Sequence, residues 1–210
     1  MVRIITDSST LYSVKQGEAL GIDVSMLSVT INNKTYREFE EINTKDFIDI
    51  INQGHIPTSS QPSIGEVLEL YNKYPQDDLL NVTIADGLSG TYQTALSAAE
   101  MAHRPERITV FNSRTLCGPH RYLVNKALEL AKGGKAVKAI VAELEKLIAT
   151  SRSFLIPQDF DYLIPFEINN APMRREIFRL IEVEGMRRSR SLRRLSEARI
   201  RRKRSAASKH

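Results

Sequence analysis

The chain has 210 residues, of which 41% are hydrophobic and 26% are charged, and its formal net charge is +5. This composition is typical of a globular protein, and the single cysteine, Cys117, excludes a disulfide framework. The lone cysteine indicates a reducing compartment, and the N-terminus reaches Asp7 before any apolar stretch that would suit a signal peptide. No apolar run approaches the roughly 18 residues of a membrane span. We therefore expect a cytoplasmic protein.

The charge is unevenly distributed along the chain. Residues 173–210 contain 14 Lys and Arg against 4 Asp and Glu, a net charge of +10, whereas residues 1–172 carry a net charge of −5. The basic segment has few apolar side chains to bury, so we expect it to be disordered or loosely helical. It could bind polyanions such as nucleic acids without sequence preference, although no zinc-finger, RNP or KH motif accompanies the arginines.

Short β-branched runs alternate with longer segments of helical period, which predicts an α/β fold with a mostly parallel sheet flanked by helices. The pair Asn32-Asn33 predicts a hairpin turn. Ser63 followed by Glu66 predicts a capping box, and Thr44 is interpreted as a second helix cap. In chain order, the predicted strands are 3–6, 24–31, 34–37, 80–84, 108–112 and 153–156, and the predicted helices are 13–20, 45–53, 64–74, 91–101, 119–131 and 136–149.

Four hydroxyl-rich segments lie where predicted strands end or helices begin. Ligands of parallel α/β sheets bind outside the carboxyl ends of the strands, so these segments are the first candidates for a site. Hydroxyls combined with the free amides of a helix N-terminus bind anions, which predicts a carboxylate or phosphate ligand. Helix capping alone explains Ser63 better than it explains Ser59, Ser60 or Ser89. The segments are Thr6-Asp7-Ser8-Ser9-Thr10, Pro57-Thr58-Ser59-Ser60-Gln61-Pro62-Ser63, Asp86-Gly87-Leu88-Ser89-Gly90-Thr91 and Asn112-Ser113-Arg114-Thr115.

A catalytic interpretation of Ser89 competes with the binding interpretation. Its surroundings resemble the nucleophile elbow G-x-S-x-G, but Thr91 stands at the second glycine, and His120 is the sole plausible base. Cys117 with His120 is a weak signal for a thiol nucleophile or half a metal site. The phosphate-loop and dinucleotide-binding motifs are absent from the sequence. We favour binding, and expect no enzyme activity, cofactor or metal.

Three of the quoted motifs, in this order and spacing, resemble the DegV family of bacterial fatty-acid-binding proteins. The resemblance covers residues 1–163 and implies a carrier. In such a protein a long-chain fatty acid lies in a tunnel between two domains, and the first domain holds its carboxylate. A partner fatty-acid kinase then phosphorylates the carboxylate for phospholipid synthesis. The motifs are Ile4-Ile5-Thr6-Asp7-Ser8, Pro57-Thr58-Ser59-Ser60-Gln61-Pro62-Ser63 and Gly87-Leu88-Ser89-Gly90-Thr91-Tyr92-Gln93.

The resemblance also implies which residues bind the carboxylate. Carried over by motif, the binding positions are Ser59, where the family usually has threonine, and Ser89 with the amide of Gly90. Asp86 stands where the family often has serine, which puts an acid near the expected anion. The full expected set is Ser59, Ser60, Ser89 and Gly90, supported by Asp7, Thr58 and Thr91.

The resemblance ends shortly after Leu163. The family continues there with a short Gly-Gly-Arg segment and a second domain that closes the tunnel, whereas this sequence reads Ile164-Pro165-Phe166-Glu167 and then becomes arginine-rich. We expect a lipid head-group domain over residues 1–165 and an Arg-rich tail over residues 166–210 in place of the second domain. Lipid binding would then be impaired. The shift from 9 Lys and 7 Arg before residue 173 to 2 Lys and 12 Arg after it is what an altered reading frame would produce.

Overall fold

The computed structural model describes residues 1–153, and a four-stranded parallel sheet carries this part of the chain. The strand order is β2-β1-β6-β7, and each neighbouring pair runs parallel. The first strand lies inside the sheet with later strands on both sides, which is a doubly wound arrangement. The predicted α/β fold is therefore confirmed. The strands are β1 (Val2–Asp7), β2 (Ile22–Ser25), β6 (Asp78–Thr83) and β7 (Ile108–Asn112).

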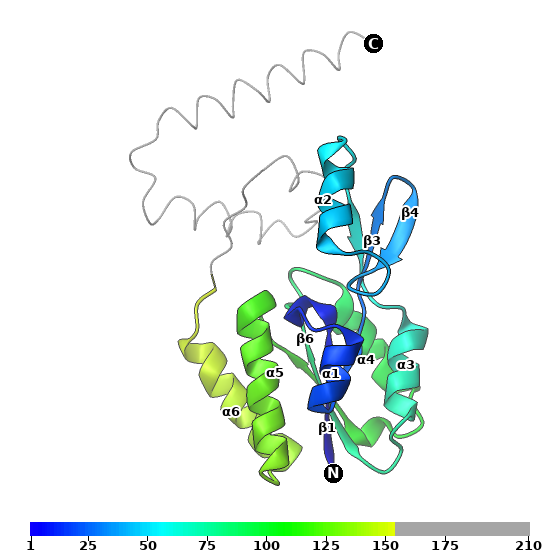
Figure 1. Ribbon diagram of the computed structural model, residues 1–210. Helices are drawn as coiled ribbons and strands as arrows, with labels where there is room; N and C mark the ends of the chain where they lie inside the picture. The colour runs from blue at the N-terminus through cyan, green and yellow to red at the C-terminus, as the bar shows by residue number, and fades with distance from the viewer. Residues whose placement is uncertain (154–210) are drawn as a thin grey trace, which may run out of the picture. The chain divides into compact units, whose positions relative to one another are not determined.

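Helices cover both faces of this sheet (Figure 1). Ile4 and Ile5 are neighbours in β1 and point to opposite faces, and both side chains are buried. Ile4 belongs to the core cluster that includes α5 and α6, whereas Ile5 belongs to the cluster that includes α3 and α4. Burial on both faces explains why apolar residues occupy consecutive strand positions, as in Ile4-Ile5 and Leu79-Leu80, instead of alternating with polar ones. The helices are α1 (Val14–Leu20), α3 (Ile64–Asn72), α4 (Thr91–Met101), α5 (Cys117–Lys132) and α6 (Val137–Thr150).

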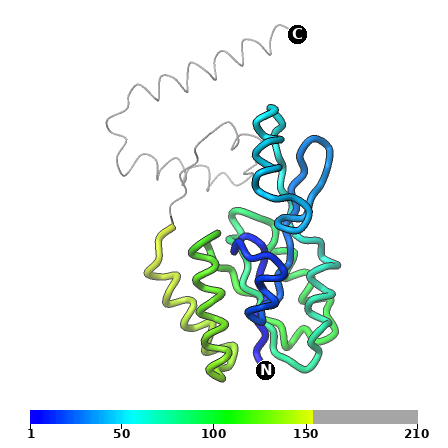
Figure 2. Tube along the Cα trace, viewed as in Figure 1, coloured from blue at the N-terminus to red at the C-terminus, as the bar shows by residue number. Residues whose placement is uncertain are grey.

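A small antiparallel sheet of order β4-β3-β5 lies beyond the end of the parallel sheet that is opposite to the N-terminus (Figures 1 and 2). The Leu27 amide, just before β3, donates to the Ser8 hydroxyl at 2.9 Å, and Ser8 directly follows β1. The small sheet is thus attached at the carboxyl edge of the parallel sheet. Its elements are β3 (Ser28–Ile31), β4 (Lys34–Arg37), β5 (Thr58–Ser60) and the helix α2 (Thr44–Asn52), and short 3-10 turns occur at Ser8–Thr10 (η1) and Pro105–Arg107 (η2).

The predicted strand 24–31 is wrong, because this segment forms two strands in different sheets. β2 ends at Ser25 and β3 begins at Ser28, and the intervening Met26 and Leu27 are buried. Met26 and Leu27 are apolar like Val24 and Val29 in the strands beside them, and no glycine, proline or charged residue marks the point where the chain leaves one sheet for the other. The segment 57–63, expected to be a loop, contains β5.

Two of the local turn and cap predictions are confirmed, and one is wrong. The hairpin at Asn32-Asn33 is confirmed, with both residues at positive φ, and so is the Ser63–Glu66 capping box. The expected cap Thr44 is wrong, since the side chain of Asn43 accepts the hydrogen bond from the Asp46 amide at 2.9 Å. Of the predicted strand 153–156 only Ser153 is described, and it is not in a strand; the basic segment lies outside the described residues.

Candidate functional site

The turn that follows β6 leads into α4 and contains Ser89 and Gly90. Gly90 is the N-cap residue of α4 and provides no capping side chain, and the first intrahelical hydrogen bond runs from Thr94 N to Gly90 O. The Ser89 hydroxyl lies 2.8 Å from the Thr91 hydroxyl and accepts from the Thr91 amide at 3.3 Å. Ser89 is half-buried and Gly90 is exposed. The turn therefore offers hydroxyls and helix-start amides to an anion.

Ser59 and Ser60 are exposed residues of β5, which pairs with β3. Ser60 lies opposite Ser28, and Ser59 lies opposite Val29. Because neighbouring side chains of a strand point to opposite faces, the two serines do not share one face. Thr58 is also exposed and is the first residue of the same strand.

The side chain of Gln61 connects these two segments. A Cβ atom at position 90 would lie 2.9 Å from Gln61 Nε2 and 3.1 Å from Gln61 Cδ, so the amide group packs directly over the Gly90 backbone. Gln61 immediately follows Ser60, and Gly90 immediately follows Ser89. The chain thus brings the ends of the two hydroxyl-bearing segments together. Gln61 belongs to one of the motifs in the sequence, but no role was expected for it. Its position directly after Ser59 and Ser60 was the one feature of the sequence that could have suggested a role in the site.

Asp7 lies beneath this edge rather than in it. Its carboxylate is fully buried and accepts hydrogen bonds from Ser9 N at 3.0 Å and from Ile84 N at 2.8 Å. Ile84 directly follows β6, so Asp7 fastens the end of β1 to the start of the turn that carries Ser89. Asp86 in that turn is exposed, and its carboxylate accepts from its neighbour Gly87 N at 2.8 Å.

His120 is buried under the same edge and is not paired with Ser89. Its Nε2 lies 3.0 Å from Val82 O, and its Nδ1 lies 2.8 Å from the Ser9 hydroxyl. Because a carbonyl oxygen only accepts, Nε2 carries the hydrogen and Nδ1 accepts from Ser9. Burial lowers the pKa of the ring, an effect that the Asp7 carboxylate and the Val82 carbonyl oppose. Both ring nitrogens are therefore occupied, which argues against the Ser89–His120 pair.

The thiol of Cys117 has a raised pKa, whereas reactive cysteines have a lowered one. Burial raises the pKa of its thiol, and the charge of Glu38 raises it further, so the thiol is protonated near neutral pH. Among residues 1–153, no group of three or more His, Cys, Asp or Glu side chains is arranged to hold a metal ion. The same part of the chain includes no helix whose length and hydropathy would let it cross a membrane.

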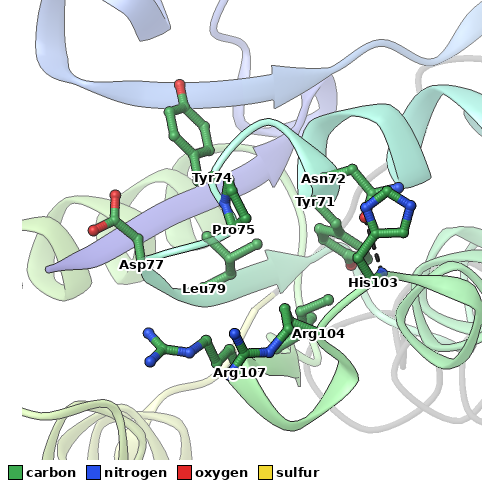
Figure 3. A pocket seen from close by; sticks show the side chains of 10 residues that line it. Tyr71, Asn72, Tyr74, Pro75, Asp77, Leu79, His103, Arg104 and Arg107 are labelled. Carbon is green, nitrogen blue, oxygen red and sulfur yellow. Dashed lines mark hydrogen bonds between the residues drawn. The ribbon is translucent and has the colours of Figure 1, made fainter.

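A pocket is found at the opposite, amino edge of the sheet (Figure 3). Its volume is about 10 Å³, which is room for roughly one water molecule. Its polar groups are partly paired, because the His103 amide donates to the Asn72 side chain at 3.0 Å and Arg107 lies 3.7 Å from Asp78. It is too small for an acyl chain and is remote from the hydroxyl-bearing turns. The side chains that Figure 3 labels are Tyr71, Asn72, Tyr74, Pro75, Asp77, Leu79, His103, Arg104 and Arg107.

The fold and this edge define a class: a doubly wound α/β domain with hydroxyl-bearing segments outside the carboxyl ends of its strands. The DegV family model, described as an uncharacterised protein of the DegV family, matches residues 1–165. This chain belongs to the DegV family.

Relatives and solved structures agree with this membership. A DegV domain-containing protein of Listeria innocua is 32% identical over 166 residues, which is 77% of this chain and 58% of that protein. The fatty-acid-binding DegV family protein of Thermus thermophilus superposes with a TM-score of 0.66 at 31% identity, over 70% of this chain and 53% of that one. DegV of Bacillus subtilis, a fatty acid binding protein, gives 0.64 at 31% identity over 71% and 54%. The chain thus spans little more than half the length of these proteins.

Proposed function

We propose that this chain binds a long-chain fatty acid and holds its carboxylate between the 59–60 and 89–90 segments. The observation that carries the proposal is the packing of the Gln61 side chain over Gly90, which joins the two segments. DegV family proteins of known structure bind fatty acids, which supports the same ligand class. The proposed carboxylate ligands are Ser59, Ser60, Ser89 and the Gly90 amide, with Thr58, Thr91 and Asp7 in support, and of the two β5 hydroxyls only one can face the carboxylate.

The chemistry of the two segments suits a carboxylate. The helix α4 has 11 residues, and its positive end attracts an anion at the place where Ser89 lies; of its first-turn amides, that of Thr91 already donates to the Ser89 hydroxyl. Each hydrogen bond to a charged group contributes roughly 1.5 to 3 kcal/mol. Burying about 14 methylenes at about 0.8 kcal/mol each contributes more, so the acyl chain supplies most of the affinity and the hydroxyls orient the head group.

Exposed apolar side chains flank the proposed head-group segments. Leu88 precedes Ser89 and is 39% exposed, Ile56 lies two residues before Thr58 and is 56% exposed, and Ile64 is 42% exposed. A contiguous exposed apolar patch is typical of a ligand-binding surface, and we propose that these three side chains contribute apolar surface for the acyl chain.

The proposed carrier presents its carboxylate to a fatty-acid kinase, which phosphorylates it for phospholipid synthesis, and we place this exchange in the cytoplasm. The exposure of Gly90 and of Ser59 supports the access that a kinase would need. We propose that residues 1–165 form the lipid head-group domain and that residues 166–210 form a separate Arg-rich tail. If half of the acyl chain is left uncovered, the lost contacts would cost about 5 kcal/mol, or a thousandfold to ten-thousandfold in affinity.

Lipid extraction from the purified full chain, with native mass spectrometry, tests the proposal. We expect the purified chain to contain bound fatty acid. The Ser89→Ala substitution should lower the affinity for the fatty acid roughly 10 to 100-fold. Ser13→Ala is the matched control, because Ser13 caps α1 and only bonds its own helix. A well-folded chain that binds no fatty acid, or equal binding by the Ser89 variant, would contradict the proposal.

A second proposed function is polyanion binding by the basic segment, favoured by the net charge of +10 in residues 173–210. Binding of this kind weakens steeply with salt because it releases counterions. Deleting residues 173–210 should abolish retention on heparin and leave fatty-acid binding in place. Retention that survives the deletion would contradict this second function.

A further inference from the structure

Ser9 and His120 form a hydrogen-bonded pair that the proposed fatty-acid site does not use. Ser9 belongs to η1 directly after β1, at the carboxyl edge of the sheet, and it is partly exposed. Its hydroxyl lies 2.8 Å from His120 Nδ1, which accepts the proton of the hydroxyl because Nε2 is the protonated nitrogen. A hydroxyl in this relation to a neutral imidazole has the geometry of a nucleophile with its base.

The ring of His120 is held by groups on its other side. Nε2 donates to Val82 O at 3.0 Å and lies 3.3 Å from the Thr6 hydroxyl, which itself donates to Val82 O at 2.8 Å. A nucleophilic site has a third component, which is a group that orients the base through its second nitrogen. The Val82 carbonyl oxygen occupies this position. The ring is fully buried and cannot turn to solvent without breaking these bonds.

The buried carboxylate of Asp7 would stabilise the positive charge that His120 gains when it accepts a proton. Asp7 is the charged group that favours protonation of His120, and its carboxylate is held in place by the Ser9 and Ile84 amides. The first turn of α5 lies beside the same residues, because Cys117 is near Glu38 and Glu38 accepts from the Ser8 hydroxyl at 2.7 Å. These contacts place a second acid beside η1, so Asp7 and Glu38 both lie near the Ser9–His120 pair.

We propose that Ser9 is a nucleophile activated by His120, with Asp7 as the stabilising carboxylate, and that it accepts an acyl group from an activated carboxylic ester. The Ser9 oxygen bonds to the ester carbonyl carbon while its proton passes to His120 Nδ1. The bond to the leaving oxygen breaks, and that oxygen takes the proton from Nδ1. Attack by one water molecule on the acyl-serine, with the same proton path, releases the carboxylic acid and restores the hydroxyl.

An alkyl fluorophosphonate tests this proposal on the full chain. Attack by Ser9 forms an oxygen–phosphorus bond, expels fluoride and leaves a stable adduct that peptide mass mapping locates. We expect an adduct at Ser9 that Ser9→Ala abolishes. His120→Gln should slow its formation at least about a hundredfold, because an amide can accept the hydrogen bond but not the proton. Ser151 is the internal control, since it is exposed but donates to the Leu147 carbonyl at 2.7 Å.

The pH profile of the unaltered chain provides a measurement that needs no variant. The labelling rate at Ser9 should fall about tenfold per pH unit once the pH is below the pKa of His120, since the protonated ring can take no further proton. No adduct at Ser9 on the folded chain overturns the proposal. So does labelling that is independent of pH, labelling of Ser151 at the same rate, or an undiminished rate in a folded His120→Gln variant.

Discussion

At the scale of single residues, a substitution at Gly90 tests the proposed fatty-acid site most sharply. A methyl group there would meet the Gln61 amide at 2.9 Å, and the amide is the movable end of a flexible side chain. We expect Gly90→Ala to fold with a change in unfolding free energy below about 1 kcal/mol, because Gln61 can move aside. Fatty-acid affinity, measured by calorimetry, should fall because the two segments are then separated.

Gly65 offers the matched control for that substitution. It lies in the first turn of α3, and the nearest atom to an added Cβ is the Ser63 hydroxyl at 4.0 Å. Gly65→Ala should leave fatty-acid affinity unchanged and stabilise the helix slightly, since alanine is the better helix former. If both alanine variants bind the ligand equally well, the contact between Gln61 and Gly90 has no part in binding.

The burial of His120 also predicts how the stability of the chain depends on pH. Burial lowers the pKa of its ring in the folded chain, so the unfolded chain binds a proton more readily. The stability that the neutral ring contributes is present above its unfolded pKa of about 6.5 and is lost as the pH falls below it. Urea unfolding at pH 7.5 and 5.5 should show a smaller loss of stability for His120→Gln than for the unaltered chain. Equal losses would mean that the ring titrates normally.

At the scale of elements, the Asp7 carboxylate connects β1 to the turn after β6. Asp7→Asn leaves one oxygen to accept, and its NH₂ group would face an amide donor, so we expect a loss of roughly 1.5 to 3 kcal/mol in unfolding free energy. Asp49→Asn is the control, since Asp49 is exposed on α2 and should change stability by less than about 0.5 kcal/mol. A similar small effect for both variants in urea titrations would show that Asp7 does not fasten this edge.

Elements whose signals are local could be predicted from the sequence, and those set by distant contacts could not. The hairpin at 32–33 and the capping box at 63–66 depend on residues within four positions of each other, and both are confirmed. β5 forms because its residues pair with β3, about thirty positions earlier, and no pattern in three exposed residues announces that pairing. The break between β2 and β3 likewise reflects the tertiary arrangement of two sheets.

The candidate site shows the same division. The motifs led to Ser59, Ser60, Ser89 and Gly90 as head-group ligands, and these assignments stay predictions. His120 was the sole plausible base for Ser89 in the sequence, but its hydroxyl partner is Ser9. No sequence pattern links these two residues, because they are 111 positions apart and meet only through the fold.

At the scale of the whole molecule, the chain spans 58% of the length of the Listeria innocua relative. The proposed carboxylate ligands predict that the chain distinguishes a fatty acid from the matched fatty alcohol. Calorimetry with palmitate and hexadecanol should show that preference, and equal affinities would argue against a carboxylate site.

In the proposed complex, one carboxylate contacts both hydroxyl-bearing segments. Titration of palmitate into the ¹⁵N-labelled full chain, followed through its amide resonances, tests this arrangement most directly. We expect the amide signals of residues 59–61 and 89–92 to shift together and to saturate at one equivalent. Shifts confined to one of the two segments, or confined to the amino edge around His103, would contradict it.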